Sequence, residues 1–225
     1  MTLVRTSLAA AALAAVMAPA TADVIALNFA GLDGDNYEQP LNFYNGGLGG
    51  LGSGPGPNYG ITFGADAITC SGQPGGACNS AQIPGGPGAN LLFFLSGSGD
   101  IMNVAAGFDT GFAFYYSAPV YSGAVEVFSG LNGTGTLLAH LDLPLTSDGS
   151  GDPACYFTNY CPYVPVGVAF AGTAQSVNFT GVANYIAFGN VTLGATAPVP
   201  EPGTYALMAL GLAGIGVATR RRRSV

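Results

Sequence analysis

The feature of this sequence that most limits its fold is the repeated interruption of short apolar runs by glycine, asparagine, aspartate and proline. The runs are rich in β-branched and aromatic residues, which is typical of strands separated by turns. The chain has 36 glycines and 15 prolines and no tryptophan, a mixture that argues against a helical bundle. We expect strands at residues 24–29, 59–63, 91–95, 101–105, 111–116, 124–128, 135–143, 164–170, 176–179 and 185–193.

Several of these runs alternate with a period of two, so that every second side chain lies on the same face of a strand. Phe112, Phe114 and Tyr116 form one such face. The region contains no helical pattern. The sequence therefore predicts an all-β fold, an antiparallel β-sandwich of the jelly-roll type, formed by one domain over residues 23–197.

The charges are distributed unevenly along the chain. Arg5 lies near the start, four arginines lie near the end, and there is no lysine. Eleven of the twelve acids fall between Asp23 and Asp152. Because nucleic acid phosphates would repel such a polyanion, nucleic acid is excluded as a partner. Neutral polysaccharide, other proteins and cations held between carboxylates are compatible.

The first 22 residues have the pattern of a secretory signal peptide. Arg5 precedes an apolar run over 8–17, and small residues over 19–22 suggest cleavage after Ala22. A spanning or amphipathic helix is a poor alternative, because the run is short and has no polar face. We therefore expect export by the Sec machinery.

Residues 198–225 have three parts: a proline-flanked glutamate, an apolar segment over 203–219 and an arginine cluster. The apolar segment would span roughly 25 Å as a helix, enough for a slightly thinned bilayer. A transmembrane helix here leaves the arginines in the cytoplasm, where such residues are favoured. The predicted sorting residues are Val199, Pro200, Glu201, Pro202, Arg220, Arg221, Arg222 and Arg223.

This tail resembles the PEP-CTERM sorting signal of Gram-negative bacteria. The resemblance implies recognition by exosortase, a membrane cysteine transpeptidase, and removal of the tail, often alongside exopolysaccharide production. The protein would then lie transiently in the inner membrane and afterwards at the cell surface or outside the cell. The same tail also carries an ice-binding label, which we take as a name for the tail only. A plain C-terminal anchor is the alternative.

The segments 108–116, 125–135 and 186–193 resemble the ectodomain of a recurrent group of uncharacterised PEP-CTERM proteins. They resemble the jelly rolls of carbohydrate-binding modules more loosely. Both resemblances imply a β-sandwich.

Four cysteines form two close pairs in the sequence. In an exported chain we expect disulfides, and pairing Cys70 with Cys78 and Cys155 with Cys161 is the simplest of three connectivities. A four-thiol zinc site is the alternative, but the C-x2-to-4-C spacing that it needs is missing.

Two patterns suggest chemistry without establishing it. Gly47, Gly49 and Gly52 match G-x-G-x-x-G, but prolines follow where a dinucleotide site needs a helix, so we expect a surface loop. His140, the single histidine, shares a predicted strand face with Leu138 and Asp142. A Ser-His-Asp site is formally possible, but no G-x-S-x-G elbow is present. We assign no catalytic residues and expect no enzyme activity.

An acidic turn is the one candidate metal site. Asp33, Asp35 and Glu38 place three carboxylates within six residues, and Ca²⁺ prefers such oxygen clusters. The resemblance to carbohydrate modules implies that Asn190, on the last strand, would complete a structural calcium site. A solvated acidic turn is the alternative.

Together these features predict a non-enzymatic surface or extracellular-matrix protein that binds polysaccharide or a neighbouring protein. A secreted hydrolase, such as a glycosidase with an unrecognised active site, is the rival interpretation. A purely structural matrix component is the third.

Overall fold

The structure is a computed structural model that describes residues 24–72, 77–78, 80–81, 83–97, 99–155 and 160–199. The predicted signal peptide, membrane segment and arginine cluster lie outside these ranges. Within them, no helix is both long and apolar enough to cross a membrane.

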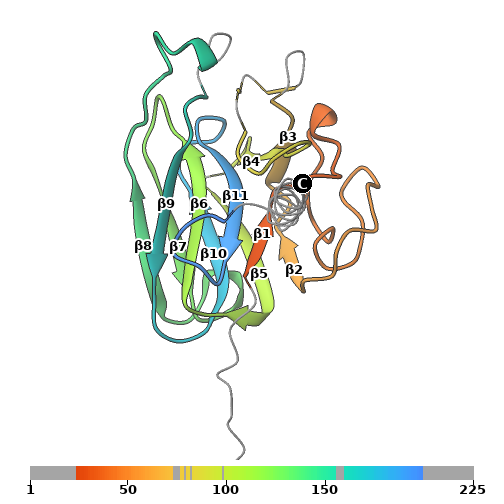
Figure 1. Ribbon diagram of the computed structural model, residues 1–225. Coiled ribbons are helices and arrows are strands. Elements are labelled where there is room, and N and C mark those ends of the chain that lie inside the picture. The colour runs from red at the N-terminus through yellow and green to blue at the C-terminus, as the bar shows by residue number, and fades with distance from the viewer. Residues whose placement is uncertain are drawn as a thin grey trace, which may run out of the picture.

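Two antiparallel sheets pack face to face, which confirms the predicted all-β sandwich (Figure 1). The six-stranded sheet has the order β3 (Ala67–Cys70), β4 (Leu91–Phe94), β11 (Ala187–Leu193), β6 (Gly111–Ser117) and β9 (Val164–Ala169), and β1 (Ile25–Leu27) also pairs with β11. The five-stranded sheet has the order β2 (Ile61–Phe63), β5 (Gly99–Phe108), β10 (Ala174–Thr180), β7 (Gly123–Phe128) and β8 (Leu137–Leu143). Short 3₁₀ turns occur at η1 (Gly34–Asn36), η2 (Leu131–Gly133) and η3 (Pro153–Cys155).

The chain passes repeatedly from one sheet to the other, as in a jelly roll. As a result the last strand, β11, lies inside its sheet between β6 on one side and β4 and β1 on the other. All seven residues of β11 are buried. Its inner face therefore contacts the core, and its outer face is covered by other parts of the chain.

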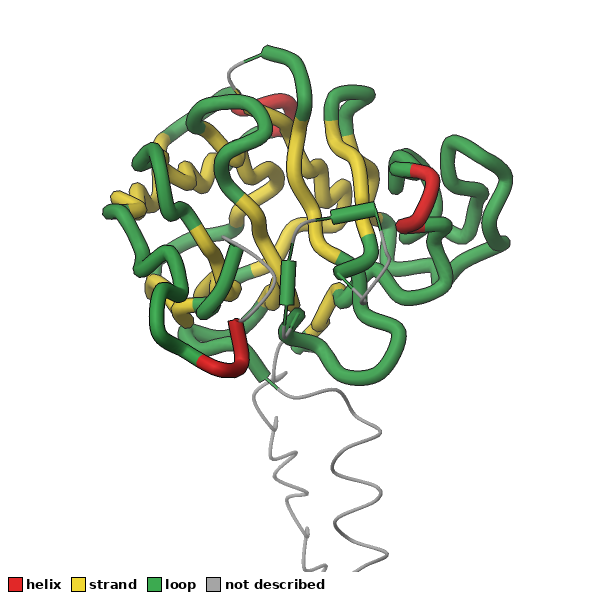
Figure 2. Tube along the Cα trace, turned by 90° about the horizontal axis from the view of Figure 1, so that it is seen from above, coloured by secondary structure: helices red, strands yellow, loops and turns green. Residues whose placement is uncertain are grey.

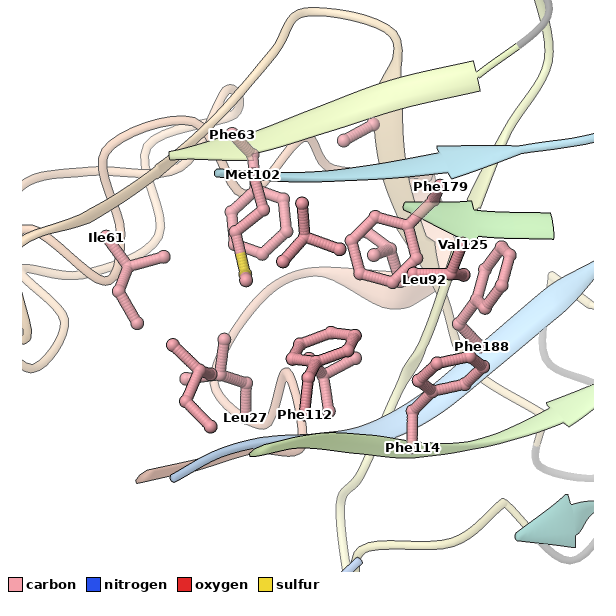
Figure 3. Close-up of a cluster of buried hydrophobic side chains, with 14 of the residues drawn as sticks. Leu27, Ile61, Phe63, Leu92, Met102, Phe112, Phe114, Val125, Phe179 and Phe188 are labelled. Carbon is pink, nitrogen blue, oxygen red and sulfur yellow. The ribbon is translucent and has the colours of Figure 1, made fainter. Parts of the chain in front are cut away.

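Aromatic rings from both sheets fill the space between them (Figure 3). Phe112 and Phe114 of β6 point inward, as the alternation predicted, and meet Phe179 of β10 and Phe188 of β11. The rings of Phe179 and Phe188 are 4.9 Å apart, edge to face, a geometry that adds about 1 kcal/mol beyond area burial. These contacts hold the two sheets at a fixed separation.

The sequence missed β3 and wrongly placed Leu138 on the same face of β8 as His140 and Asp142. All four residues of β3 are buried, so this strand has no alternation to detect. A register shift in the pairing of β7 with β8 changes which side chains at the start of β8 point toward the core. Leu138 consequently packs against the core, whereas Leu137 is 48% exposed.

Residues 28–60 form loops at one side of the sandwich (Figures 1 and 2). The glycine-rich part is a compact loop, closed by the bridge between Asn45 and Asn58 and by the hydrogen bond from Gly49 N to Ser53 O, 2.9 Å. No helix follows it, as the prolines predicted.

Candidate functional site

A cavity of about 480 Å³ lies on the outer side of the six-stranded sheet, over β4 and the start of β11. Its lining comes from strands, from the acidic turn and from loops that are distant in sequence. The lining residues are Tyr37, Ala77, Cys78, Ser80, Leu91, Phe93, Leu95, Tyr160, Asn184, Ile186 and Ala187. We call this space the aromatic cavity.

The sequence of β4 explains why an apolar surface faces outward here. Leu92 and Phe94 belong to the main core between the sheets, whereas Leu91 and Phe93 belong to a second apolar cluster on the other face. Successive strand side chains point to opposite faces, so a continuous apolar run needs cover on both. The loops above β4 provide this cover incompletely, and the cavity is the part that remains open.

Tyr37 forms one wall of the cavity. Its backbone adopts the left-handed conformation, with φ at 58°. Its hydroxyl donates to the carbonyl of Ala77 at 2.6 Å, and its ring meets the edge of Phe93 at a centroid distance of 6.1 Å. Because the side chain is held at both ends and Tyr37 remains 42% exposed, it offers a preorganised aromatic surface to solvent.

Polar groups around the cavity are paired with the main chain. The Tyr160 hydroxyl donates to the carbonyl of Asn184, and the Ser80 hydroxyl donates to the carbonyl of Tyr160 at 3.1 Å. Burial, reinforced by the nearby Tyr185, raises the pKa of Tyr160, so this hydroxyl stays protonated at neutral pH. No charged side chain lies among the described residues of the lining.

The described lining of the cavity is suited to binding an uncharged ligand. Aromatic and aliphatic walls suit the apolar faces of a ligand, and hydroxyl and carbonyl oxygens at the rim can accept its hydrogen bonds. An ionic ligand would find no counter-charge. A neutral, amphipathic molecule fits this chemistry.

Disulfides hold the loops beside the cavity, with the connectivity predicted from the sequence. Cys70, the last residue of β3, pairs with Cys78, which lines the cavity. Cys155 pairs with Cys161, next to Tyr160. Both bonds close short loops, with sequence separations of 8 and 6 residues.

The acidic side chains of the turn accept hydrogen bonds within the turn and from other parts of the fold. Asp33 accepts from both the backbone and the side-chain nitrogen of Asn36, and Asp35 accepts from the Ser71 hydroxyl. Glu38 is completely buried. No group of three or more His, Cys, Asp or Glu side chains suited to a metal occurs in the described ranges. The calcium hypothesis stays a prediction from the sequence.

Glu38 anchors the glycine-rich loop through its carboxylate. Oε1 accepts from the backbone nitrogens of Leu51 at 2.9 Å and Ser53 at 3.0 Å, and Oε2 accepts from Asp33 N at 2.6 Å. Burial by itself would raise the pKa of Glu38, but these donors lower it below its usual value. The carboxylate therefore stays ionised without any cation.

Asn190 lies on the outer face of β11, where its side-chain amide donates to the carbonyl of Val199 at 2.9 Å. Its Oδ1 is buried and has no hydrogen-bond partner among the described atoms. No hydrogen bond joins it to the acidic turn within the described residues. Val199 is the one predicted sorting residue in the described part; Pro200, Glu201, Pro202, Arg220, Arg221, Arg222 and Arg223 lie outside it.

Two further groups of titratable side chains lie elsewhere in the structure, one around His140 and one around Asp100. His140 is half-exposed between Glu126, 3.5 Å from Nδ1, and Asp142, 3.2 Å from Nε2. Asp100 is 6% exposed and close enough to Asp66 for charge repulsion. Neither His140 nor Asp100 lines the aromatic cavity.

Comparison with known proteins identifies the tail. The family model of the PEP-CTERM protein-sorting motif matches residues 198–223. The motif implies an exported protein that passes through the membrane. The chain thus carries the PEP-CTERM sorting motif that the resemblance indicated. No curated protein matches the sequence.

Solved structures resemble the sandwich only weakly. The K2 cleaved adhesin domain of Lys-gingipain has a TM-score of 0.40 and 14% identity, covering 60% of this chain and 88% of that one. An arabinoxylan arabinofuranohydrolase of glycoside hydrolase family 43 from Bacillus subtilis, solved with cellotetraose, has a TM-score of 0.35 and 19% identity, covering 51% of this chain and 23% of that one. A carbohydrate-binding module of Cellvibrio mixtus lichenase 5A, solved with cellotriose, has a TM-score of 0.33 and 12% identity, covering 52% and 92%. These similarities are too low to carry an argument about ligands.

Proposed function

We propose that this chain is a non-enzymatic surface or extracellular-matrix protein, sorted by exosortase, whose sandwich binds neutral polysaccharide in the aromatic cavity. The observation that carries the proposal is an uncharged cavity with the exposed, fixed ring of Tyr37 in its wall. Aromatic rings stack on the apolar faces of sugars, and rim oxygens accept hydrogen bonds from sugar hydroxyls.

The charge of the domain supports a neutral ligand. Residues 24–199 contain ten acids and no lysine or arginine. An acidic polysaccharide would be repelled, and nothing in this range could pair with its carboxylates or sulfates. Neutral polymers meet no such barrier.

The sorting part of the proposal has its own support and test. The motif at 198–223 supports recognition by exosortase after passage through the inner membrane. Entry through the Sec machinery is proposed from the signal-peptide pattern of the first 22 residues. We expect a strain that lacks the sorting peptidase to accumulate the unprocessed chain in its membrane. Normal processing and surface display in that strain would contradict this part.

Substitution of one wall tyrosine tests the binding part. The protein purified after export should be retarded in gels that contain neutral glucan, mannan or xylan, but not in gels that contain alginate. Tyr37→Ala should weaken retention roughly fivefold or more, equivalent to one lost ring contact. Tyr59→Ala is the matched control, because Tyr59 is 43% exposed and lines a different cavity.

Equal retention of all three proteins would show that the cavity is not the site. Retention by none of the neutral polymers would remove polysaccharide as the ligand and leave a protein partner or a structural role.

The rival function is a secreted hydrolase. Asp100 favours it in one respect, because burial raises the pKa of this carboxyl to about 7, suitable for a general acid beside Asp66. However, the Oδ2 atom of Asp100 is inaccessible, and Asp100 lines neither cavity named above. Substrate cleavage abolished by Asp100→Asn or Glu126→Gln would favour the hydrolase over adhesion.

A further inference from the structure

The last strand contains a bulge at a position that matters for the tail. Gly189 pairs with Tyr115 of β6, and Thr192 pairs with Ala113, so β11 has one extra residue between these pairs. Asn190 lies in this bulge with φ at 47°. A bulge redirects side chains locally, and asparagine tolerates this backbone conformation better than most residues.

The bulge directs two polar side chains at one residue. Val191 and Leu193 point into the core, whereas Asn190 and Thr192 point outward. The Asn190 amide donates to Val199 O at 2.9 Å, and Val199 N donates to the Thr192 hydroxyl at 3.5 Å. Both backbone polar groups of Val199 are therefore bound by buried side chains of β11.

Small residues of the neighbouring strands make room for the segment that leads to Val199. We call residues 195–199 the strap. A Cβ atom on Gly167 of β9 would lie 2.3 Å from Thr196 O, and one on Gly111 of β6 would lie 2.7 Å from the Thr196 methyl group. Ala113, between them, is completely buried. The strap thus crosses the outer face of β6 and β9 in close contact and returns to β11.

The sorting motif begins inside this strap. The match starts at residue 198, so its first two residues, Pro198 and Val199, are already part of the folded domain. Glu201 follows two residues later, at most about 7 Å along an extended chain. The domain and the Pro-Glu-Pro sequence have no flexible spacer between them.

We infer that the strap remains on the mature protein and that the sorting peptidase breaks a peptide bond beyond Val199. This inference rests on the proposed sorting function. A peptidase must bind its substrate as accessible chain, and the strap is docked with the polar groups of Val199 engaged. In the reaction the carbonyl carbon of the broken bond passes to water or to an amine acceptor, and the amine half takes up a proton and leaves with the rest of the tail.

The first measurement locates the end of the mature chain. The full chain is produced in a strain that carries the sorting peptidase, and the processed protein is examined by mass spectrometry of its C-terminal peptide. We expect the last residue to be number 199 or a later one. A mature chain that ends at residue 198 or earlier overturns the inference.

The second measurement tests whether docking is the cause. Asn190→Gly removes the amide but accepts the positive φ, and Gly167→Val fills the space below Thr196. A broad-specificity protease should trim residues 195–199 at least tenfold faster in both variants than in the wild type. Ala105→Val, on the exposed part of β5, is the control with added bulk and should behave like the wild type.

Equally fast trimming of the wild type and both variants contradicts the docked strap. A wild-type chain that keeps its whole tail in the peptidase strain contradicts the proposed sorting function. The strap is then judged by the same digestion of the unprocessed chain, so the two failures are distinguishable.

Discussion

Replacing Asp100 with asparagine should abolish a loss of stability that the wild-type protein undergoes as the pH rises through neutrality. Asp100 lies on β5 and is 6% exposed, and its Oδ2 has no partner among the described atoms. Burial raises its pKa from 3.8 to about 7, and the negative charge of Asp66 adds to this. The backbone N–H groups of Ile101, Ala67 and Gly64 oppose the shift only partly.

The sign of the effect follows from the two pKa values. Between pH 4 and 7 the folded protein keeps a proton on Asp100 that the unfolded chain releases, so raising the pH favours unfolding. The stabilising contribution is complete below the unfolded pKa and is lost as the pH rises through the folded one. The full difference corresponds to about 4 kcal/mol, of which about 2 kcal/mol falls between pH 5 and 7.

Thermal unfolding at pH 5, 6, 7 and 8 measures this effect. For a domain of this size about 2 kcal/mol corresponds to a fall in Tm of roughly 4–8 °C. The Tm of Asp100→Asn should lack this fall, and the difference between the two proteins cancels the contributions that both proteins share. Asp66→Asn should move the transition to lower pH, because it removes the repelling charge.

Asp109→Asn serves as the control, since Asp109 is exposed, and it should keep the wild-type slope. The reasoning would be refuted by a wild-type Tm that is constant from pH 5 to 8, or by an Asp100→Asn variant that retains the whole slope.

Three further predictions concern the acidic turn. Glu38→Gln should lower the free energy of unfolding by about 2–3 kcal/mol in chemical denaturation at pH 7, because the glutamine amide nitrogen would face another donor, the backbone nitrogen of Asp33. An unchanged denaturation midpoint would contradict the anchoring role of Glu38. The wild-type advantage over Glu38→Gln should shrink as the pH falls below about 4.5, since the stabilising ionised form has a lowered pKa and is protonated in acid. Removal of calcium with a chelator should leave the Tm unchanged, because the three carboxylates already accept hydrogen bonds. A drop of several degrees that only Ca²⁺ restores, together with binding heat in calorimetry, would instead establish the calcium site.

The sandwich was predictable because most strands have an alternating pattern that survives in the fold. Phe112 and Phe114 face the core as their spacing requires. Each of the ten predicted segments overlaps an observed strand. The pattern fails where a strand is buried on both faces, as in β3, and where a bulge changes the facing, as at Leu137 and Leu138.

The candidate site was not predictable to the same extent, because it depends on which segments meet. The run from Leu91 to Phe94 indicates burial on both faces, but it does not reveal that Tyr37 and Tyr160 flank the outer one. The bulge in β11 leaves no signal in the sequence beyond an asparagine inside a strand. The sorting motif of the tail could be recognised from local pattern, because its parts are consecutive, and the family model matches it over residues 198–223.

The absence of lysine and arginine from residues 24–199 determines which protonation state each buried acid adopts. Neither Glu38 nor Asp100 can pair with a lysine or arginine, because none occurs between residues 24 and 199. Glu38 stays ionised because its carboxylate accepts three hydrogen bonds from backbone N–H groups. Asp100 has one carboxyl oxygen without a hydrogen-bond partner among the described atoms, and burial raises its pKa to about 7. Hydrogen bonds to a carboxylate favour the ionised form, and burial favours the neutral one. The two acids should therefore respond to pH in opposite directions, so that the stability of the domain is greatest in the mildly acidic range between their transitions.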